Sequence, residues 1–187
     1  MPTGTAGAKS PHISAILAVM NRNDVAKQNQ RGFTLIEMAV VIIIIAILAS
    51  ITLPSYLERN VRLQIEAALP LADIAKKPVA AAWTAQMPFP VDNIAAWLPV
   101  ADKIVNNYVS AVAIQDGAIN ITFGNQAAGA IRGKILTLRP AVVADAPVVP
   151  VTWVCGNANP PDKMTVKGNN QTSVPANYLP LECRLRN

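Results

Sequence analysis

The sequence predicts an α+β fold, in which one long amino-terminal helix packs on a small antiparallel β-sheet. An uncharged apolar run at 38–53 extends a helix that is long enough to span a membrane. Helical spacing of apolar residues continues after this run, and short apolar segments alternate with turn residues in the second half of the chain. We therefore expect three parts, comprising residues 1–32, 33–53 and 54–187.

The apolar residues of the chain are concentrated near its amino terminus. The chain is 52% hydrophobic but only 14% charged, below the ~25% charged residues of typical soluble domains. As a helix, residues 33–53 would extend about 31 Å, close to the ~30 Å hydrocarbon core of a bilayer. A buried core helix would show a polar stripe, and a secretory signal would have a shorter apolar region. We therefore expect residues 33–53 to span a membrane.

Charge on the amino-terminal side of this segment sets its orientation. Residues 1–32 contain four basic side chains and one acidic side chain, which are Lys9, Arg22, Lys27, Arg31 and Asp24. By the positive-inside tendency this segment stays in the cytoplasm, and everything after Leu53 is exported. Removing residues 1–32 would lower the formal charge from +5 to +2. The basicity of the whole chain is therefore a poor argument for nucleic-acid binding.

The junction between the first two parts has a specific sequence. Residues 27–38 read Lys-Gln-Asn-Gln-Arg-Gly-Phe-Thr-Leu-Ile-Glu-Met, and the apolar run that follows leads to Pro54. This resembles the signature of type IV pilins and pseudopilins, in which a basic leader ends in glycine, phenylalanine follows, and glutamate comes four residues later. The match covers about 30 contiguous residues and combines several independent requirements, so it is a specific signal.

The resemblance implies roles for individual residues. A prepilin peptidase would cleave between Gly32 and Phe33, and the new amino-terminal Phe33 would be N-methylated. Glu37 would pair with the Phe33 amine of a neighbouring subunit during assembly. The alternative for Glu37 is an interfacial position, because it lies less than two turns from the helix start and could reach the lipid headgroups. Pro54 removes a backbone donor and should kink the helix.

Helical spacing continues beyond Pro54. Apolar residues recur every four positions at Leu57, Val61, Ile65 and Leu69. Charged residues alternate with them, so one face should pack on the exported domain. Pro70 and Pro78 should each bend or interrupt the helix. We expect a curved or broken helix to about Ala85, ended by the Met-Pro-Phe-Pro sequence at 87–90.

The remainder predicts a small antiparallel sheet, and with the long helix laid across it this is the architecture of pilins. The four expected strands are 108–114, 118–123, 133–138 and 148–154. Gln115-Asp-Gly117 separates the first two and is a strong hairpin signal. A Pro- and Ala-rich connection at 140–147 separates the last two. After Val154, turn-forming residues predict a loop.

Cys155 and Cys183 both lie in the expected exported domain. An even count in an oxidising compartment is most simply one disulfide. A metal site would need more Cys or His ligands nearby, and the chain has no Cys-x-x-Cys for redox exchange. The loop 155–183 would then be a closed subunit contact or exposed binding surface. Residues 178–184 resemble the carboxy-terminal end of type IVa pilins.

The chain offers little catalytic chemistry. The only histidine, His12, lies in the expected leader, and the sequence has no Gly-x-Ser-x-Gly and no phosphate-binding glycine loop. We expect no enzyme activity, no cofactor and no metal site. Basic residues near the carboxy terminus are Lys163, Lys167, Arg184 and Arg186. We interpret them as a solvated face, with DNA as a secondary candidate partner, because only Tyr178 is available for stacking.

The leading hypothesis is a structural subunit of a type IV pilus that serves adhesion, twitching motility or DNA uptake. Prepilin peptidase would process it, and it would sit in the inner membrane with a cytoplasmic amino terminus. The pilus assembly machinery would then polymerise it with other copies into an extracellular bacterial filament that contacts host or abiotic surfaces. The alternatives are a type II secretion pseudopilin and a membrane-tethered binding module or enzyme. The last leaves Gly32 and Glu37 unexplained.

Overall fold

A computed structural model of the chain describes residues 32–185, apart from the side chain of Pro54. The rest of the predicted leader, residues 1–31, and the basic residue Arg186 lie outside the described residues. The chain divides into two compact units, Met1–Ile47 and Leu48–Asn187.

Helix α2 comprises Leu35–Ala68. Its residues 38–53 contain no polar side chain until Ser50, so no apolar stripe distinguishes one face from the others. The helical stretch that begins at Leu35 is long and apolar enough to cross a membrane, and its most apolar part is not buried within the protein. The backbone of α2 is helical through Pro54, and the kink at this residue stays a prediction.

The helix is interrupted where the sequence predicted. A 3₁₀ turn, η1 at Leu69–Ala72, contains Pro70 and separates α2 from α3 at Asp73–Thr84. Pro78 lies inside α3 without ending it. After α3 the chain turns at Gln86, whose φ is +55°, and the Met87 amide donates to the Ala82 carbonyl at 2.9 Å. This bond over five residues is the Schellman arrangement that terminates helices.

One face of the helical stretch is buried against the sheet. Its buried residues, spaced by three or four positions, are Val61, Ile65, Ala68, Ala72, Ala75, Val79 and Ala82. All of them except Ala82 form a common core with strand residues such as Phe123 and Leu136. The expectation that this face begins at Leu57 is wrong, because Leu57 is 60% exposed. It lies one turn before the first residue that the core covers.

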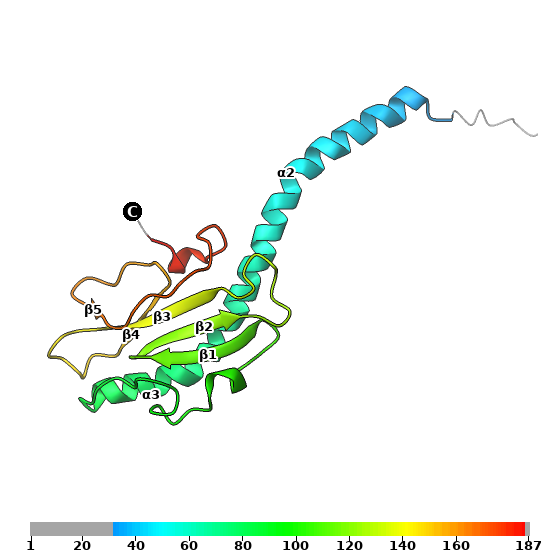
Figure 1. The fold of residues 1–187 in the computed structure, drawn as a ribbon. Helices are drawn as coiled ribbons and strands as arrows, with labels where there is room; N and C mark the ends of the chain where they lie inside the picture. The colour runs from blue at the N-terminus through cyan, green and yellow to red at the C-terminus, as the bar shows by residue number, and fades with distance from the viewer. Residues whose placement is uncertain (1–31, 186–187) are drawn as a thin grey trace, which may run out of the picture. The chain divides into compact units, whose positions relative to one another are not determined.

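The sheet has five antiparallel strands, ordered β1-β2-β3-β4 with β5 beside β3 (Figure 1). The strands are β1 Val109–Gln115, β2 Ala118–Phe123, β3 Ile135–Val142, β4 Thr152–Cys155 and β5 Thr165–Val166. Short 3₁₀ turns, η2 at Ala101–Lys103 and η3 at Leu181–Cys183, precede β1 and close the carboxy-terminal region. The α+β architecture predicted from the sequence is confirmed.

The predicted hairpin joins β1 to β2. Gln115 pairs with Ala118, so Asp116 and Gly117 form a two-residue turn. Their φ values are +48° and +82°, as a type I′ turn requires at both central positions. A Cβ on Gly117 would also lie 2.8 Å from the Phe89 ring. Both the turn and the close approach therefore favour glycine at this position.

Three details of the sheet differ from the sequence prediction. β3 continues through Pro140 to Val142, although the connection was expected to begin at Pro140. Pro140 lies beyond the last β2 pairing, and its carbonyl accepts a bond from the Lys167 amide at 2.8 Å. β4 begins at Thr152 instead of 148, and Val148 is 86% exposed. β5 lies in the region predicted to be only loop, because its pairing partner is distant in sequence.

Candidate assembly segment and carboxy-terminal region

The start of α2 is fixed by a side-chain cap. The Glu37 amide donates to Thr34 Oγ1 at 3.3 Å. Thr34 therefore satisfies one of the amides that the first helical turn leaves without a backbone partner. The sequence analysis missed Thr34, although a threonine followed by glutamate three residues later is the recognised capping-box pattern. This cap determines where the helix begins relative to Phe33.

Glu37 lies in the first turn of α2. The partial positive charge at a helix amino terminus stabilises a carboxylate at this position. Among the described residues, the ion pairs are Arg62–Glu58, Lys76–Asp73 and Lys103–Asp102, so Glu37 has no cationic partner there. The amino terminus of its own helix thus stabilises the Glu37 carboxylate, but no cationic side chain within residues 32–185 pairs with it.

The surroundings of the predicted cleavage position are open. Phe33 is 75% exposed, and a Cβ built on Gly32 would have no described atom within 4 Å. The large apolar side chains from Phe33 to Leu53 are 44–92% exposed. Soluble monomers rarely expose a contiguous apolar surface of this extent. This surface requires an apolar environment, which a membrane or a set of neighbouring helices provides.

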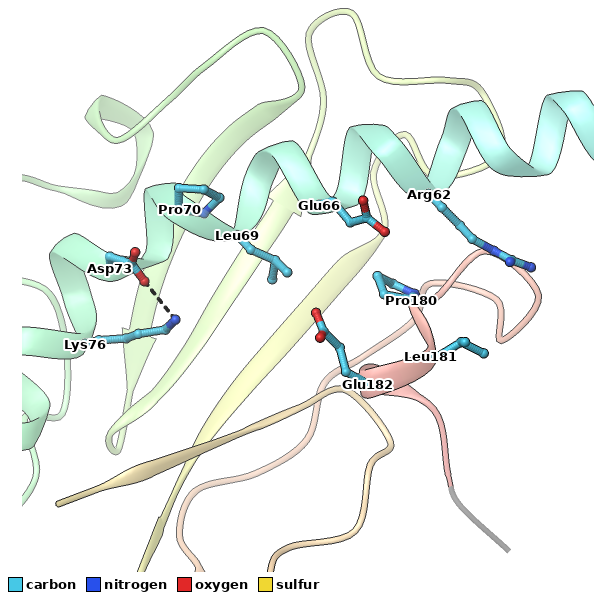
Figure 2. Close-up of a pocket in the computed structure, with 9 residues that line it drawn as sticks. All are labelled: Arg62, Glu66, Leu69, Pro70, Asp73, Lys76, Pro180, Leu181 and Glu182. Atoms are coloured by element: carbon cyan, nitrogen blue, oxygen red, sulfur yellow. Dashed lines mark ion pairs between the residues drawn. The ribbon is translucent and has the colours of Figure 1, made fainter. Parts of the chain in front are cut away.

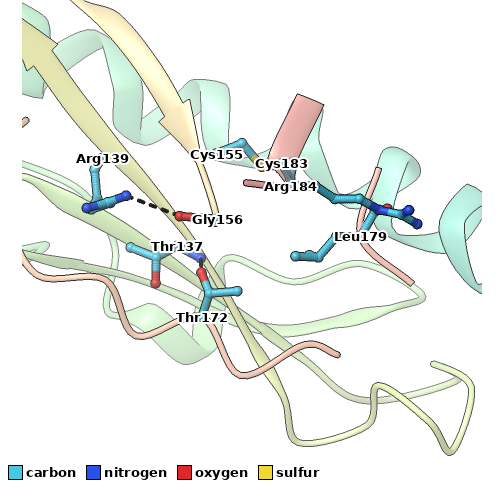
Figure 3. The surroundings of a disulfide bond; sticks show 8 residues. All are labelled: Thr137, Arg139, Cys155, Gly156, Thr172, Leu179, Cys183 and Arg184. Carbon is cyan, nitrogen blue, oxygen red and sulfur yellow. Dashed lines mark hydrogen bonds between the residues drawn. A yellow bond between two sulfur atoms is a disulfide. The ribbon is translucent and has the colours of Figure 1, made fainter. Parts of the chain in front are cut away.

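A disulfide joins Cys155, at the end of β4, to Cys183 in η3 (Figure 3). Both cysteines are buried. The Asn157 amide donates to the Cys183 carbonyl at 2.9 Å, which reinforces the closure beside the sulfur atoms. Gly156 has a φ of +55°, and a Cβ at this position would lie 2.8 Å from the same carbonyl. The closure therefore depends on a residue without a side chain.

The region between the two cysteines is attached to the sheet along β3. The Gln171 amide donates to Thr137 Oγ1 at 3.0 Å, and the Thr137 amide donates to Thr172 Oγ1 at 3.1 Å. The Ser173 amide also donates to the Ile135 carbonyl at 2.9 Å. The carboxy-terminal segment thus extends the sheet partly through side-chain hydroxyls, a pairing that periodicity alone does not reveal.

One arginine attaches the same region to α2, and a second arginine holds the region together from within. The carbonyl of Asn177 accepts bonds from Arg62 Nη2 at 2.7 Å and from Arg184 Nη2 at 2.9 Å. Glu58 lies 3.7 Å from the Arg62 guanidinium and offsets part of this charge. Arg184, predicted to belong to a solvated basic face, is therefore half-buried and engaged within the protein. Lys163 and Lys167 remain exposed.

Arg139 points toward the disulfide region from β3 (Figure 3). Its Nη2 donates to the Gly156 carbonyl at 3.2 Å, while its Nε is buried without a partner among the described residues. Burial lowers the pKa of the Arg139 guanidinium from its usual value. This pKa still starts so high that the side chain stays charged near neutral pH.

An open groove of about 680 Å³ lies between the helices and η3 (Figure 2). Its lining comprises Arg62, Glu66, Leu69, Pro70, Asp73, Lys76, Pro180, Leu181 and Glu182. Asp73 and Lys76 are paired at 2.8 Å. The groove contains no histidine, cysteine or hydroxyl nucleophile, and residues 32–185 hold no cluster of three metal-ligating side chains. Its chemistry suits contact with another surface better than catalysis.

Comparison with known protein families finds matches near both ends of the chain. The sequence model of the pilin family, which is described as a bacterial filament family, matches residues 61–184. A second model, the prokaryotic N-terminal methylation motif, matches residues 27–53. The two matched ranges together extend from the predicted leader junction to the residue after Cys183.

Curated relatives resemble the chain over most of its length. The type IV major pilin protein PilE of Neisseria gonorrhoeae is 31% identical over 83% of this chain and 94% of its own. A fimbrial protein of Neisseria meningitidis serogroup B is 30% identical with the same coverage. Fimbrial protein EcpC of Eikenella corrodens is 34% identical over 84% of this chain and 93% of its own.

Proposed function

Because the chain belongs to the type IV pilin family and is a structural pilus subunit, we propose that it is cleaved after Gly32, methylated at Phe33 and assembled through Glu37. Residues 1–32 are the leader, residues 33–53 span the membrane, and residues 54–187 form the exported head. The match of the methylation motif to residues 27–53 supports this division.

The observation that carries the mechanism is an unpaired carboxylate in an exposed apolar helix. Glu37 lacks a cationic partner among the described residues, whereas its neighbours are apolar. An ionised carboxylate in hydrocarbon costs several kcal/mol unless it is paired. Cleavage between Gly32 and Phe33 creates an amine at Phe33, and this amine on a neighbouring subunit supplies the missing charge. Processing and assembly are thereby coupled electrostatically.

The precursor is membrane-anchored and the assembled protein is an extracellular pilus. More specifically, the precursor sits in the inner membrane with its amino terminus in the cytoplasm, where four basic residues precede the helix. Prepilin peptidase and the pilus assembly machinery are its partners. The relatives described above carry the names of pilins and fimbrial proteins, which favours a pilus over a secretion pseudopilin and over an enzyme. Adhesion and motility are its proposed uses, with DNA as a secondary partner.

The test compares mature subunit in membranes with subunit in sheared filaments. Glu37→Val and Glu37→Gln should both give cleaved subunits that stay in the membrane, because each variant removes the charge and leaves Gly32 and Phe33 intact. Thr34→Val is the matched control, since it removes the capping hydroxyl but keeps the carboxylate. It should cost about 1 kcal/mol of helix stability and still yield filaments. Filaments in normal quantity from Glu37→Val would show that Glu37 is only interfacial.

A further inference from the structure

A loop that is held by buried hydrogen bonds follows α3 and precedes η2. This segment, residues 91–98, is called the Trp97 loop below. Its anchor is Asn93, which is buried and whose Nδ2 donates to the Pro99 and Val112 carbonyls, both at 2.9 Å. Asn93 Oδ1 accepts a bond from the Ile114 amide at 2.6 Å. These contacts fix the loop against the edge strand β1.

The Trp97 loop presents large apolar side chains to solvent. Trp97 is 96% exposed, Ile94 is 69% exposed and Val91 is 61% exposed. Trp97 also has a φ of +57°, a conformation that is unfavourable for a bulky residue. Backbone strain of this kind persists only where the surrounding structure imposes it, and it clusters at binding sites. Exposed tryptophans are frequent energetic centres of protein interfaces.

Three aspartates lie at the same end of the sheet as the loop. Asp116 is in the β1–β2 turn, and its amide donates to the Val91 carbonyl at 3.3 Å. Asp92 is within the loop, and Asp145 follows β3, which ends beside the start of β2. All three are exposed, and none is in an ion pair among the described residues. Two lysines that are in no ion pair within residues 32–185, Lys163 and Lys167, flank this end from the β5 side.

Basic side chains gather at the opposite end of the sheet. The connection 124–134 between β2 and β3 carries Arg132 and Lys134, both exposed, and Figure 1 shows it beside α2. The Ala128 amide donates to Gln64 Oε1 at 2.9 Å and holds the connection on the helix. Neither Arg132 nor Lys134 is in an ion pair among the described residues. These two residues define the basic end.

We propose that the Trp97 loop of one subunit binds the basic end of a second copy of this chain. A tryptophan face beside carboxylates suits a guanidinium, because the ring attracts the cation and the carboxylate neutralises it. The contact joins two different surfaces at opposite ends of one sheet, so it repeats from copy to copy and builds an open polymer. This inference rests on the proposed function, since it requires filaments in which heads meet.

The first experiment measures sheared filaments from cells that produce the full chain. Trp97→Ala should lower the filament yield by about tenfold or more, as expected for loss of a central interface tryptophan. Leu185→Ala removes another exposed leucine, 62% accessible, outside both surfaces and should leave the yield unchanged. The Cys155–Cys183 disulfide, checked by mass spectrometry, reports that the Trp97→Ala head has folded.

Charge reversal tests the basic end separately. Arg132→Glu should lower the filament yield, while Arg132→Lys keeps a positive charge at the same position and should not. Wild-type filaments should also dissociate more readily at high salt, because exposed charges are screened. A normal yield from Arg132→Glu would overturn the assignment of the partner surface even if Trp97→Ala assembles poorly.

Crosslinking identifies directly the protein that the Trp97 loop binds. Ala95→Cys combined with Ala130→Cys places new thiols on exposed positions beside Trp97 and Arg132, at opposite ends of one head, and leaves both of those side chains in place. A short thiol crosslinker can therefore join the two thiols only between copies. The expected result is a ladder of crosslinked subunits, in which mass spectrometry finds the peptide that contains position 95 linked to the peptide that contains position 130. A crosslink to a different protein, or normal filaments without any ladder, would overturn the inference. Wild-type cells without filaments of this chain would instead refute the proposed function itself.

Discussion

Removing the disulfide should destabilise the head without unfolding it. Replacing Cys155 and Cys183 together by alanine opens a closure across 28 residues, worth about 3.6 kcal/mol in the chain-entropy model. Alanine is preferable to serine because both sites are buried, and a buried hydroxyl would add its own penalty. The hydrogen bonds to β3 and to Arg62 remain, so the region should stay docked. With a small cavity term, the expected loss is about 3–5 kcal/mol.

Thermal unfolding of the purified mature chain in detergent provides the measurement. For a protein of this size, each kcal/mol shifts the midpoint by about 2–4 °C, so a loss of about 3–5 kcal/mol should make the double variant melt about 6–20 °C lower than wild type. A reductant should lower the wild-type midpoint to a similar extent. The double variant is the control for the reductant, because it has no disulfide to lose and its midpoint should not change.

Two results would refute this reasoning. Non-reducing mass spectrometry could detect two free thiols in the wild-type protein, in which case no disulfide exists to remove. Alternatively, the reductant could convert the disulfide to thiols without moving the midpoint. The disulfide would then contribute nothing to the free energy of unfolding. The contacts of residues 170–174 and Asn177 would suffice to hold the carboxy-terminal region.

Two further predictions concern single residues. Gly32→Val should block processing, so that the full precursor accumulates in the membrane, and a mature-sized chain on an immunoblot would contradict the proposed cleavage position. Asn93→Ala leaves the Ile114 amide and two carbonyls unpaired in a buried site, so it should lower the unfolding free energy by about 2–4 kcal/mol in urea titration. A change below about 0.5 kcal/mol would mean that water or a shifted backbone replaces the lost contacts.

Local signals explain why much of the fold could be predicted from the sequence. The hairpin depends on two adjacent residues, Asp116 and Gly117, whose preferred backbone conformations already fit a type I′ turn. The helix break depends on Pro70, which lacks the required amide. The buried helix face follows from spacing, except that Leu57 matches the spacing but lies outside the packed region. In each case the decisive interaction acts within a few residues.

Interactions between distant residues explain what the sequence could not reveal. β5 exists because Val166 meets Ala141, and Pro140 can extend β3 only because no β2 residue needs its missing amide there. Asn93 reads as an ordinary loop residue until β1 is placed beside it. The exposure of the Trp97 loop was not predicted from the sequence for the same reason. A tryptophan in a sequence is usually assigned to a core. Only the loop backbone, which the hydrogen bonds of Asn93 hold in place, shows that Trp97 faces solvent.

The composition of residues 33–53 bears on how neighbouring subunits could find one register. Glu37 is the only charged residue in this segment, and the large side chains around it are aliphatic or aromatic. Apolar surfaces attract one another without direction, so a shift of one helix along another by a turn would change the buried area little. A buried polar or charged group is the recognised means of fixing register between helices. On the proposed mechanism, the apolar surface therefore supplies affinity, and the pairing of Glu37 with the Phe33 amine selects one alignment.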